Sequence, residues 1–281
     1  MKQQPNYSVA FIGAGNMAGA IIRGLLAQGF DPSRLIATTQ SAESAERIRS
    51  QLGINVAASN AEACRHAEVI VLAVKPQSMR AVCAEIRAEL QAGCLVISVA
   101  AGLRLETLQA WLETDTKPQI ALVRSMPNTP SAIGRGATGL FYSSAVNADQ
   151  RAVAETILSA VGVTCTVDDE ALLDVVTALS GSGPAYFFYF IELMQQTAEA
   201  MGLDTQSAET LALQTALGAA ELAHEHKNVP RLRAQVTSPK GTTEQALKVF
   251  QSQGLPDLVK NAMQACAERA QQLAYELGKV S

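Results

Sequence analysis

A glycine-rich loop close to the N-terminus constrains the fold of this chain more than any other feature. Residues 11–19 read FIGAGNMAG, directly after an apolar, β-rich run and before a helical pattern at 17–28. In such a strand–loop–helix unit, Gly13 permits the tight turn, Gly15 lets a pyrophosphate approach the backbone, and Ala18 lets the helix lie against the strand. The unpaired N–H groups at the start of the helix attract phosphate. The loop therefore predicts a dinucleotide-binding fold.

The first half of the chain alternates between strand and helix patterns, which supports this interpretation because the glycine pattern alone also fits an ordinary turn. The predicted strands lie at residues 7–12, 34–38, 56, 69–74, 95–99 and 120–124, and the helices between them at 41–52, 78–91 and 105–112. Alternation at this spacing is typical of βαβ units with a parallel sheet and right-handed crossovers. We therefore expect an α/β Rossmann domain, with a doubly wound and mainly parallel sheet, over residues 1–166.

From about Glu170 the pattern becomes purely helical, which predicts an all-α domain over residues 167–281. Long helices are expected at 182–201, 205–226 and 255–277, with a short apolar helix at 245–250. The first of them contains residues 186–190, which are all aromatic, out of 13 aromatic residues in the chain. A helix that is apolar on every face has to be buried on every face. A partner subunit is the favoured explanation, and the central helix of a monomeric bundle is the alternative.

Composition narrows the class of protein. A length of 281 residues favours two domains, and 48% hydrophobic residues suffice for a large core. The net charge of −4 argues against a nucleic-acid or membrane-surface binder, which needs excess cation. The longest aliphatic run, residues 69–74, is far below the roughly 18 residues that span a bilayer. The five cysteines contain no CxxC pair, so we expect reduced thiols, no metal site and a cytoplasmic protein.

The end of the second predicted strand bears on the choice of cofactor. NAD sites usually have Asp or Glu here for the ribose hydroxyls, whereas residues 38–41 read TTQS. Neutral hydroxyls on Thr39 and Ser41 can bond a 2′-phosphate without repelling it. The sequence therefore favours NADPH, with NADH as an alternative because no arginine occupies the turn itself.

Two stretches free of Asp and Glu stand out in an otherwise acidic chain. Residues 117–148 include the rigid loop MPNTP at 126–130, and residues 227–240 contain four cations. Positive stretches of this kind suit an anionic ligand, although a solvated basic face explains most such stretches. The second stretch runs into TSPKGTT at 237–243, just before a predicted helix. Backbone N–H groups at a helix start together with the hydroxyls of this segment form a cradle for a carboxylate.

At these residues the chain closely resembles the pyrroline-5-carboxylate reductases. The segment LRAQVTSPKGTTEQAL at 232–247 is similar to the signature of that family. Five further motifs precede this segment in family order, namely the 13–18 loop, AVKP at 73–76, AAG at 100–102, MPNTP at 126–130 and LSGSGPAY at 179–186. The resemblance spans essentially the whole chain. One departure is Lys240, where the family usually has glycine, and lysine resists a positive φ.

The resemblance implies reduction of Δ1-pyrroline-5-carboxylate to L-proline with NAD(P)H, the last step of proline biosynthesis. It also implies a Rossmann domain followed by a helical domain that interlocks in a homodimer, with decamers as a common further assembly. Its implied cofactor residues fall into three groups. The pyrophosphate would be held by Ile12, Gly13, Ala14, Gly15, Asn16 and Met17. The 2′-phosphate and ribose would be held by Thr39, Ser41 and Asn60, and the nicotinamide half by Ala73, Val74, Lys75 and Ala101, with Asn128 nearby.

On the substrate side, the resemblance implies that the Thr243 hydroxyl bonds the ring nitrogen and orients or relays its proton. Ser238, Gly241 and Thr242 would hold the carboxylate, and Glu170 matches a family position near the substrate nitrogen. Two other functions stay open at this point. One is another imine or β-hydroxyacid reductase, although hydroxyacid enzymes lack the 237–243 loop. The other is a non-catalytic NADP-binding regulator.

Overall fold

The computed structural model describes residues 7–117 and 119–279 and divides into two compact units. The first unit contains the chain up to Ser182 together with the C-terminal stretch from Cys266. The second unit consists of Gly183–Ala265. The chain therefore leaves the first unit, builds the second and returns.

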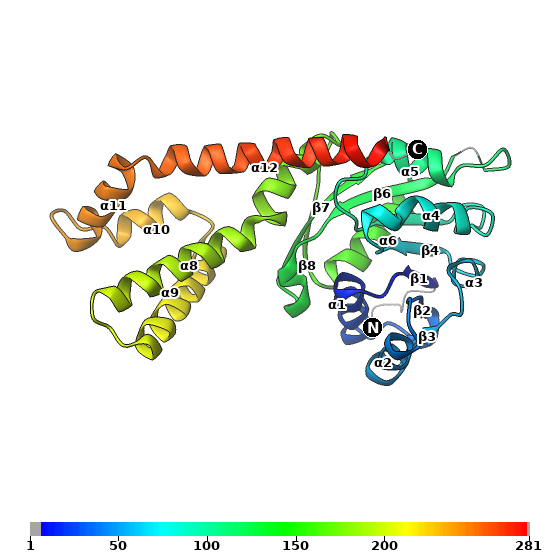
Figure 1. The fold of residues 1–281 in the computed structure, drawn as a ribbon, viewed down its shortest axis with the longest axis horizontal. Coiled ribbons are helices and arrows are strands. Elements are labelled where there is room, and N and C mark those ends of the chain that lie inside the picture. The colour runs from blue at the N-terminus through cyan, green and yellow to red at the C-terminus, as the bar shows by residue number, and fades with distance from the viewer. Residues whose placement is uncertain (1–6, 118, 280–281) are drawn as a thin grey trace. The chain divides into compact units, whose positions relative to one another are not determined.

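One sheet forms the centre of the first unit (Figure 1). Its spatial order is β3-β2-β1-β4-β5-β6-β7-β8. All pairs are parallel except β6 with β7, which is antiparallel. The strands are β1 (Val9–Ile12), β2 (Leu35–Ala37), β3 (Asn55–Val56), β4 (Val69–Leu72), β5 (Leu95–Ser98), β6 (Ala121–Met126), β7 (Gly136–Tyr142) and β8 (Gly162–Thr166). This confirms the predicted doubly wound, mainly parallel α/β domain.

Successive residues of the central strands point into two separate cores. Val9 and Phe11 lie in one core, whereas Ala10 and Ile12 lie in the other. The first core is covered by α1 (Asn16–Ala27), α2 (Ala42–Leu52) and α6 (Ala148–Ser159). The second is covered by α3 (Asn60–Cys64), α4 (Pro76–Ile86) and α5 (Leu105–Leu112). A strand buried on both faces has to be continuously apolar, which explains the uninterrupted runs in the sequence.

The last part of the sheet was not expected from the sequence. Beyond β6 the chain forms the short helix η2 (Thr129–Ile133), then β7, α6 and β8. Strands β7 and β8 have a mixed composition in which apolar residues do not alternate regularly with polar ones. They include Thr138, Gly139, Thr164 and Thr166. Strand β8 lies at the edge of the sheet and is mostly exposed, so its residues are not constrained to be apolar.

The second unit is helical and has almost no core of its own. It contains α8 (Gly183–Ala200), α9 (Thr205–His226), α10 (Val229–Gln235), α11 (Thr242–Ser252) and the start of α12 (Leu255–Gly278). Its only buried residues are Gly183, Ala208 and Ala212, which carry little or no side chain. Phe187 on α8 is 72% exposed in the single chain. Within the unit, Phe190 of α8 contacts Phe250 of α11, with 6.1 Å between the ring centroids.

The two compact units do not divide at the end of the sheet. Between β8 and α8 the chain forms α7 (Leu172–Val176) and a π-helical turn (Thr177–Gly181), and Leu173 is fully buried within the first unit. At the other end, Leu273 and Leu277 of α12 lie beside Gly102 in the turn after β5. The predicted boundary at residue 166 follows the end of the strand pattern, whereas packing keeps α7 and the end of α12 with the sheet.

Candidate functional site

A hollow of about 700 Å³ lies at the carboxyl ends of β1, β2 and β4. The strand order reverses between β1 and β4, and parallel sheets bind ligands outside the strand ends at such a reversal. Nine of the predicted cofactor residues line this hollow. They are Gly13, Ala14, Gly15, Thr39, Ser41, Asn60, Ala73, Val74 and Lys75.

The start of α1 is shaped for an anion. Gly15 is the N-cap and provides no side-chain hydrogen bond, and no acidic residue occupies the first turn. The N–H groups of that turn are therefore open to a phosphate. Gly13 has φ +89°, and a Cβ there would lie 2.7 Å from Cγ1 of Val74. The loop thus requires glycine both for its backbone conformation and for its contact with the residues after β4, which fits a dinucleotide pyrophosphate.

Thr38 holds this loop against the end of β2, and the sequence did not single it out. Its hydroxyl accepts the N–H of Gly13 at 3.1 Å and donates to Oδ1 of Asn60 at 2.6 Å. Its carbonyl accepts the N–H of Ala14 at 2.9 Å. The Asn60 amide in turn donates to Glu85 at 2.7 Å. A buried hydroxyl directly after a strand is thus the structural anchor of the loop, and both Thr38 and Thr39 line the hollow.

A second hollow, of about 680 Å³, adjoins the first on the other side of the loop. The two share Ala14, Gly15 and Arg47, and the second is also lined by the predicted residues Asn16 and Met17. Arg47 and Ser44 on α2 were not predicted as site residues. The spacing of Ser41, Ser44 and Arg47 by threes places them on one face of the helix, which is the signal that could have found them.

Three predicted residues lie elsewhere in the first unit. Ile12 is fully buried, and its carbonyl accepts the N–H of Ala73 at 2.9 Å, so it shapes the loop from within the sheet. Ala101 lies in the exposed turn after β5 and lines neither hollow. Asn128 is buried, and its amide bridges the carbonyl of Ser180 and the N–H of Ala137, both at 2.9 Å. These contacts make Asn128 a scaffold residue.

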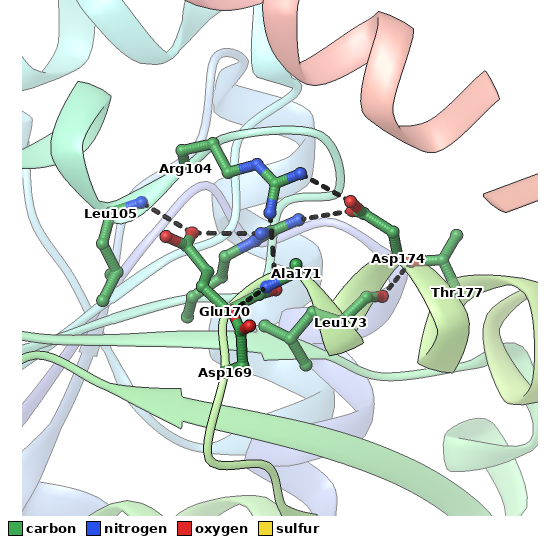
Figure 2. A network of polar contacts seen from close by, with 9 residues as sticks. Arg104, Leu105, Asp169, Glu170, Ala171, Leu173, Asp174 and Thr177 are labelled. Carbon is green, nitrogen blue, oxygen red and sulfur yellow. Dashed lines mark hydrogen bonds and ion pairs between the residues drawn. The ribbon is translucent and has the colours of Figure 1, made fainter. Parts of the chain in front are cut away.

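Glu170 belongs to a network of four charges (Figure 2). Its carboxylate accepts the N–H of Leu105 at 2.8 Å and a guanidinium N–H of Arg124 at 3.0 Å. Arg104 pairs with Asp174, which is 1% exposed and lies 3.5 Å from the Arg124 guanidinium. Glu170 therefore caps the start of α5 and neutralises a buried arginine. Both hydrogen bonds reach the same oxygen, Oε1, of the Glu170 carboxylate.

The predicted carboxylate cradle lies in the second unit, so Thr243 and Glu170 belong to different compact units. Gly241 is the N-cap of α11, again without a side-chain cap, and Thr242 and Thr243 begin the first turn. A Cβ on Gly241 would lie 2.4 Å from the Ser238 hydroxyl and 3.0 Å from the Ser238 carbonyl oxygen, so a larger residue would displace that hydroxyl. The hydroxyls of Ser238, Thr242 and Thr243 are exposed and have no hydrogen-bond partner among the described residues. They are free to bind a ligand.

Lys240 adopts a left-handed backbone conformation. Its φ is +63°, in the region that favours glycine. The N–H of Lys240 donates to Glu244 at 3.0 Å, and Lys248 pairs with the same carboxylate at 3.1 Å. Lys248, followed by the Lys240 N–H, holds the pKa of Glu244 below its usual range. These contacts stabilise the first turn of α11 around a residue that resists its own backbone conformation.

Models of known protein families match both the N-terminal and the C-terminal part of the chain. A family model described as pyrroline-5-carboxylate reductase dimerisation matches residues 170–273. Another, described as NADP oxidoreductase, coenzyme F420-dependent, matches residues 8–102. The chain is 46% identical over 272 residues to the pyrroline-5-carboxylate reductase of Pseudomonas aeruginosa, which covers 96% of this chain and 98% of the relative.

Solved structures agree with this result. A pyrroline-5-carboxylate reductase from Coxiella burnetii is 42% identical with a TM-score of 0.91, covering 96% of this chain and 99% of that one. The Plasmodium falciparum pyrroline carboxylate reductase, solved with NADP bound, is 27% identical with a TM-score of 0.83, over the same shares of the two chains. Across the described residues, no helix is long and apolar enough to cross a membrane, and no group of His, Cys, Asp and Glu is suited to hold a metal ion.

The fold and the first hollow define an NAD(P)-dependent oxidoreductase. The helical part adds a dimerisation domain to that class. The chain belongs to the pyrroline-5-carboxylate reductase family, which confirms the resemblance found in its motifs.

Replacing Thr38 by valine should weaken both the fold and cofactor binding. Valine keeps the shape of the side chain but leaves the Gly13 N–H and the Asn60 carbonyl without their partner, at a cost of about 1–3 kcal/mol. We expect a lower melting temperature and a several-fold higher KM for NADH, a cofactor without a 2′-phosphate. Thr39→Val is the matched control, with a change in stability of under about 0.5 kcal/mol. Equal melting temperatures for the two variants would contradict the anchoring role of Thr38.

Proposed function

We propose that this chain reduces Δ1-pyrroline-5-carboxylate to L-proline with NADPH, the final step of proline biosynthesis. The observation that carries the proposal is the 46% identity to the Pseudomonas aeruginosa enzyme over nearly the full length of both chains. The test follows the loss of NADPH absorbance on addition of pyrroline-5-carboxylate, and a β-hydroxyacid with NADP⁺ is the control. Turnover of the imine and none of the hydroxyacid is the expected result. The reverse pattern would refute the proposal.

In this proposal the first hollow and its neighbour hold the dinucleotide. The Gly13–Gly15 backbone and the open first turn of α1, with Asn16 and Met17, receive the pyrophosphate. Thr39 and Ser41 receive the 2′-phosphate and Asn60 the adenosine ribose. The residues after β4 and β5 support the nicotinamide half, namely Ala73, Val74, Lys75 and Ala101. When bound, NADPH supplies the hydride that reduces the C=N carbon.

The loop at the start of α11 receives the substrate in this proposal. Ser238, Gly241 and Thr242 hold the carboxylate through hydroxyl and backbone N–H groups, which the helix start leaves unpaired. The Thr243 hydroxyl bonds the ring nitrogen and orients or relays the proton that this nitrogen carries in the product. An imine is basic enough to be protonated without a strong acid, so positioning supplies most of the acceleration. Glu170 stays a predicted catalytic residue, and its contacts favour an indirect role.

Removing the Thr243 hydroxyl should lower turnover while leaving NADPH binding intact. Loss of one positioned hydrogen bond costs about 1–3 kcal/mol, or roughly 10- to 100-fold in kcat. Thr243→Ser keeps the hydroxyl and should retain much more activity than Thr243→Ala. Steady-state kinetics with both substrates varied separates kcat from the two KM values. Wild-type kcat and KM in the alanine variant would remove the hydroxyl from the mechanism.

The same proposal includes a homodimer, with a decamer as a further assembly. Support comes from the dimerisation model and from a second unit of 83 residues that buries only glycine and alanine. Apolar side chains on α8 and α9 that a single chain leaves exposed need a partner surface. The cytoplasmic location stays a prediction from the cysteine pattern.

Sedimentation at micromolar concentration should therefore show no monomer. The smallest species expected has twice the chain mass of 29.7 kDa, because half a dimer would expose the aromatic side chains of α8. A Phe187→Glu variant places a charge in that surface and should shift the distribution toward monomer. A stable wild-type monomer would overturn the dimer.

A further inference from the structure

Helix α2 presents one positively charged side chain to the cofactor hollow. Ser41 is the N-cap of the helix, and Ser44 and Arg47 follow at intervals of three residues. All three line the hollow with Thr39 and Gln40 from the end of β2. Arg47 also lines the second hollow, so its side chain lies where the two adjoin. A guanidinium here faces the same space as the hydroxyls assigned to the 2′-phosphate.

The charge of Arg47 is not neutralised by neighbouring carboxylates. Arg49, two residues later, pairs with Glu46 at 3.8 Å, whereas Arg47 has no ion pair within the described ranges. Glu43 lies one turn before Arg47 but is not paired with it. No described Asp or Glu lines either hollow, and the other cations there are Arg23 and Lys75. Glu85 is the acid that approaches this region, where it is bonded to Asn60.

We infer that Arg47 determines the preference for NADPH over NADH by pairing with the 2′-phosphate. The inference rests on the proposed placement of that phosphate at Thr39 and Ser41. Their hydroxyls tolerate a phosphate, but they also tolerate a ribose hydroxyl, so they discriminate weakly. A guanidinium adds charge and up to two parallel N–H donors, which a phosphate accepts and a hydroxyl cannot match. The arginine that the β2 turn itself lacks is thus supplied from the following helix.

This role makes the effect of Arg47 specific to one phosphate group. A charge-assisted pair lost from a partly exposed site is expected to weaken NADPH binding by roughly tenfold. NADH, whose ribose carries no phosphate, should be bound almost unchanged. Arg47→Lys keeps the charge but loses the planar fork, so it should fall between wild type and Arg47→Ala. Raised salt should weaken NADPH binding by the wild type more than by Arg47→Ala.

The test compares wild type, Arg47→Ala, Arg47→Lys and Arg49→Ala in the full-length enzyme. Calorimetry measures binding of adenosine 2′,5′-bisphosphate and of adenosine 5′-monophosphate, and kinetics gives KM and kcat for NADPH and NADH. In Arg47→Ala we expect a roughly tenfold loss of affinity for the 2′-phosphorylated compounds alone. Arg49→Ala, on the same helix but outside both hollows, should behave as wild type.

The possible failures separate this inference from the proposed function. If the wild type discriminates between the two adenosine compounds and Arg47→Ala does so equally, Arg47 is not the determinant while the cofactor assignment stands. If Arg47→Ala loses affinity for both compounds alike, its role is structural and the inference is wrong. If the wild type itself shows no preference for a 2′-phosphate, the NADPH assignment fails and the inference fails with it.

Discussion

The central strands of the sheet in the first unit are buried on both faces, and the rest of the unit follows from that constraint. Residues of β1 and β4 alternate between two apolar cores, so neither face of the central strands can carry polar chemistry. Along β1 and β4, polar groups begin only at the strand ends, where the backbone leaves the sheet and helices begin. Thr38, the open first turn of α1 and the face of α2 with Arg47 all lie at that edge. The position of the cofactor site is thus a consequence of how the core is filled.

One charged group is nevertheless buried within the sheet. Arg124 of β6 is 4% exposed and is neutralised by Glu170 and Asp174. Glu170 lies between β8 and α7, and Asp174 lies in α7. Burying such charges is costly, and removing one partner leaves the others uncompensated. The network therefore gives the segment around α7 one specific position against the sheet. It also explains why α7 belongs to the first unit although the strand pattern has already ended.

Local patterns in the sequence predict the parts of the candidate site that lie on one loop. The 13–18 loop, the acid-free end of β2 and the hydroxyl-rich start of α11 each lie within a few residues of chain. Contacts between distant segments could not be predicted in this way. Asn128 and Glu170 had polar side chains that suited a ligand, but their partners are Ser180 and Arg124, which only the fold brings near. Lys240 shows the reverse case, because it keeps a backbone conformation that lysine disfavours while its N–H bonds Glu244, only four residues along the chain.

The return of the chain to the first unit has a consequence for how the protein is made. Domains generally fold as they emerge from the ribosome, N-terminal parts first. Here Leu277 packs against the core beneath α4 and α5, and it lies beside Gly102 in the turn after β5. The first unit therefore joins β1 to a stretch of α12 that is synthesised much later. Its packing can be completed only after this stretch of α12 has left the ribosome.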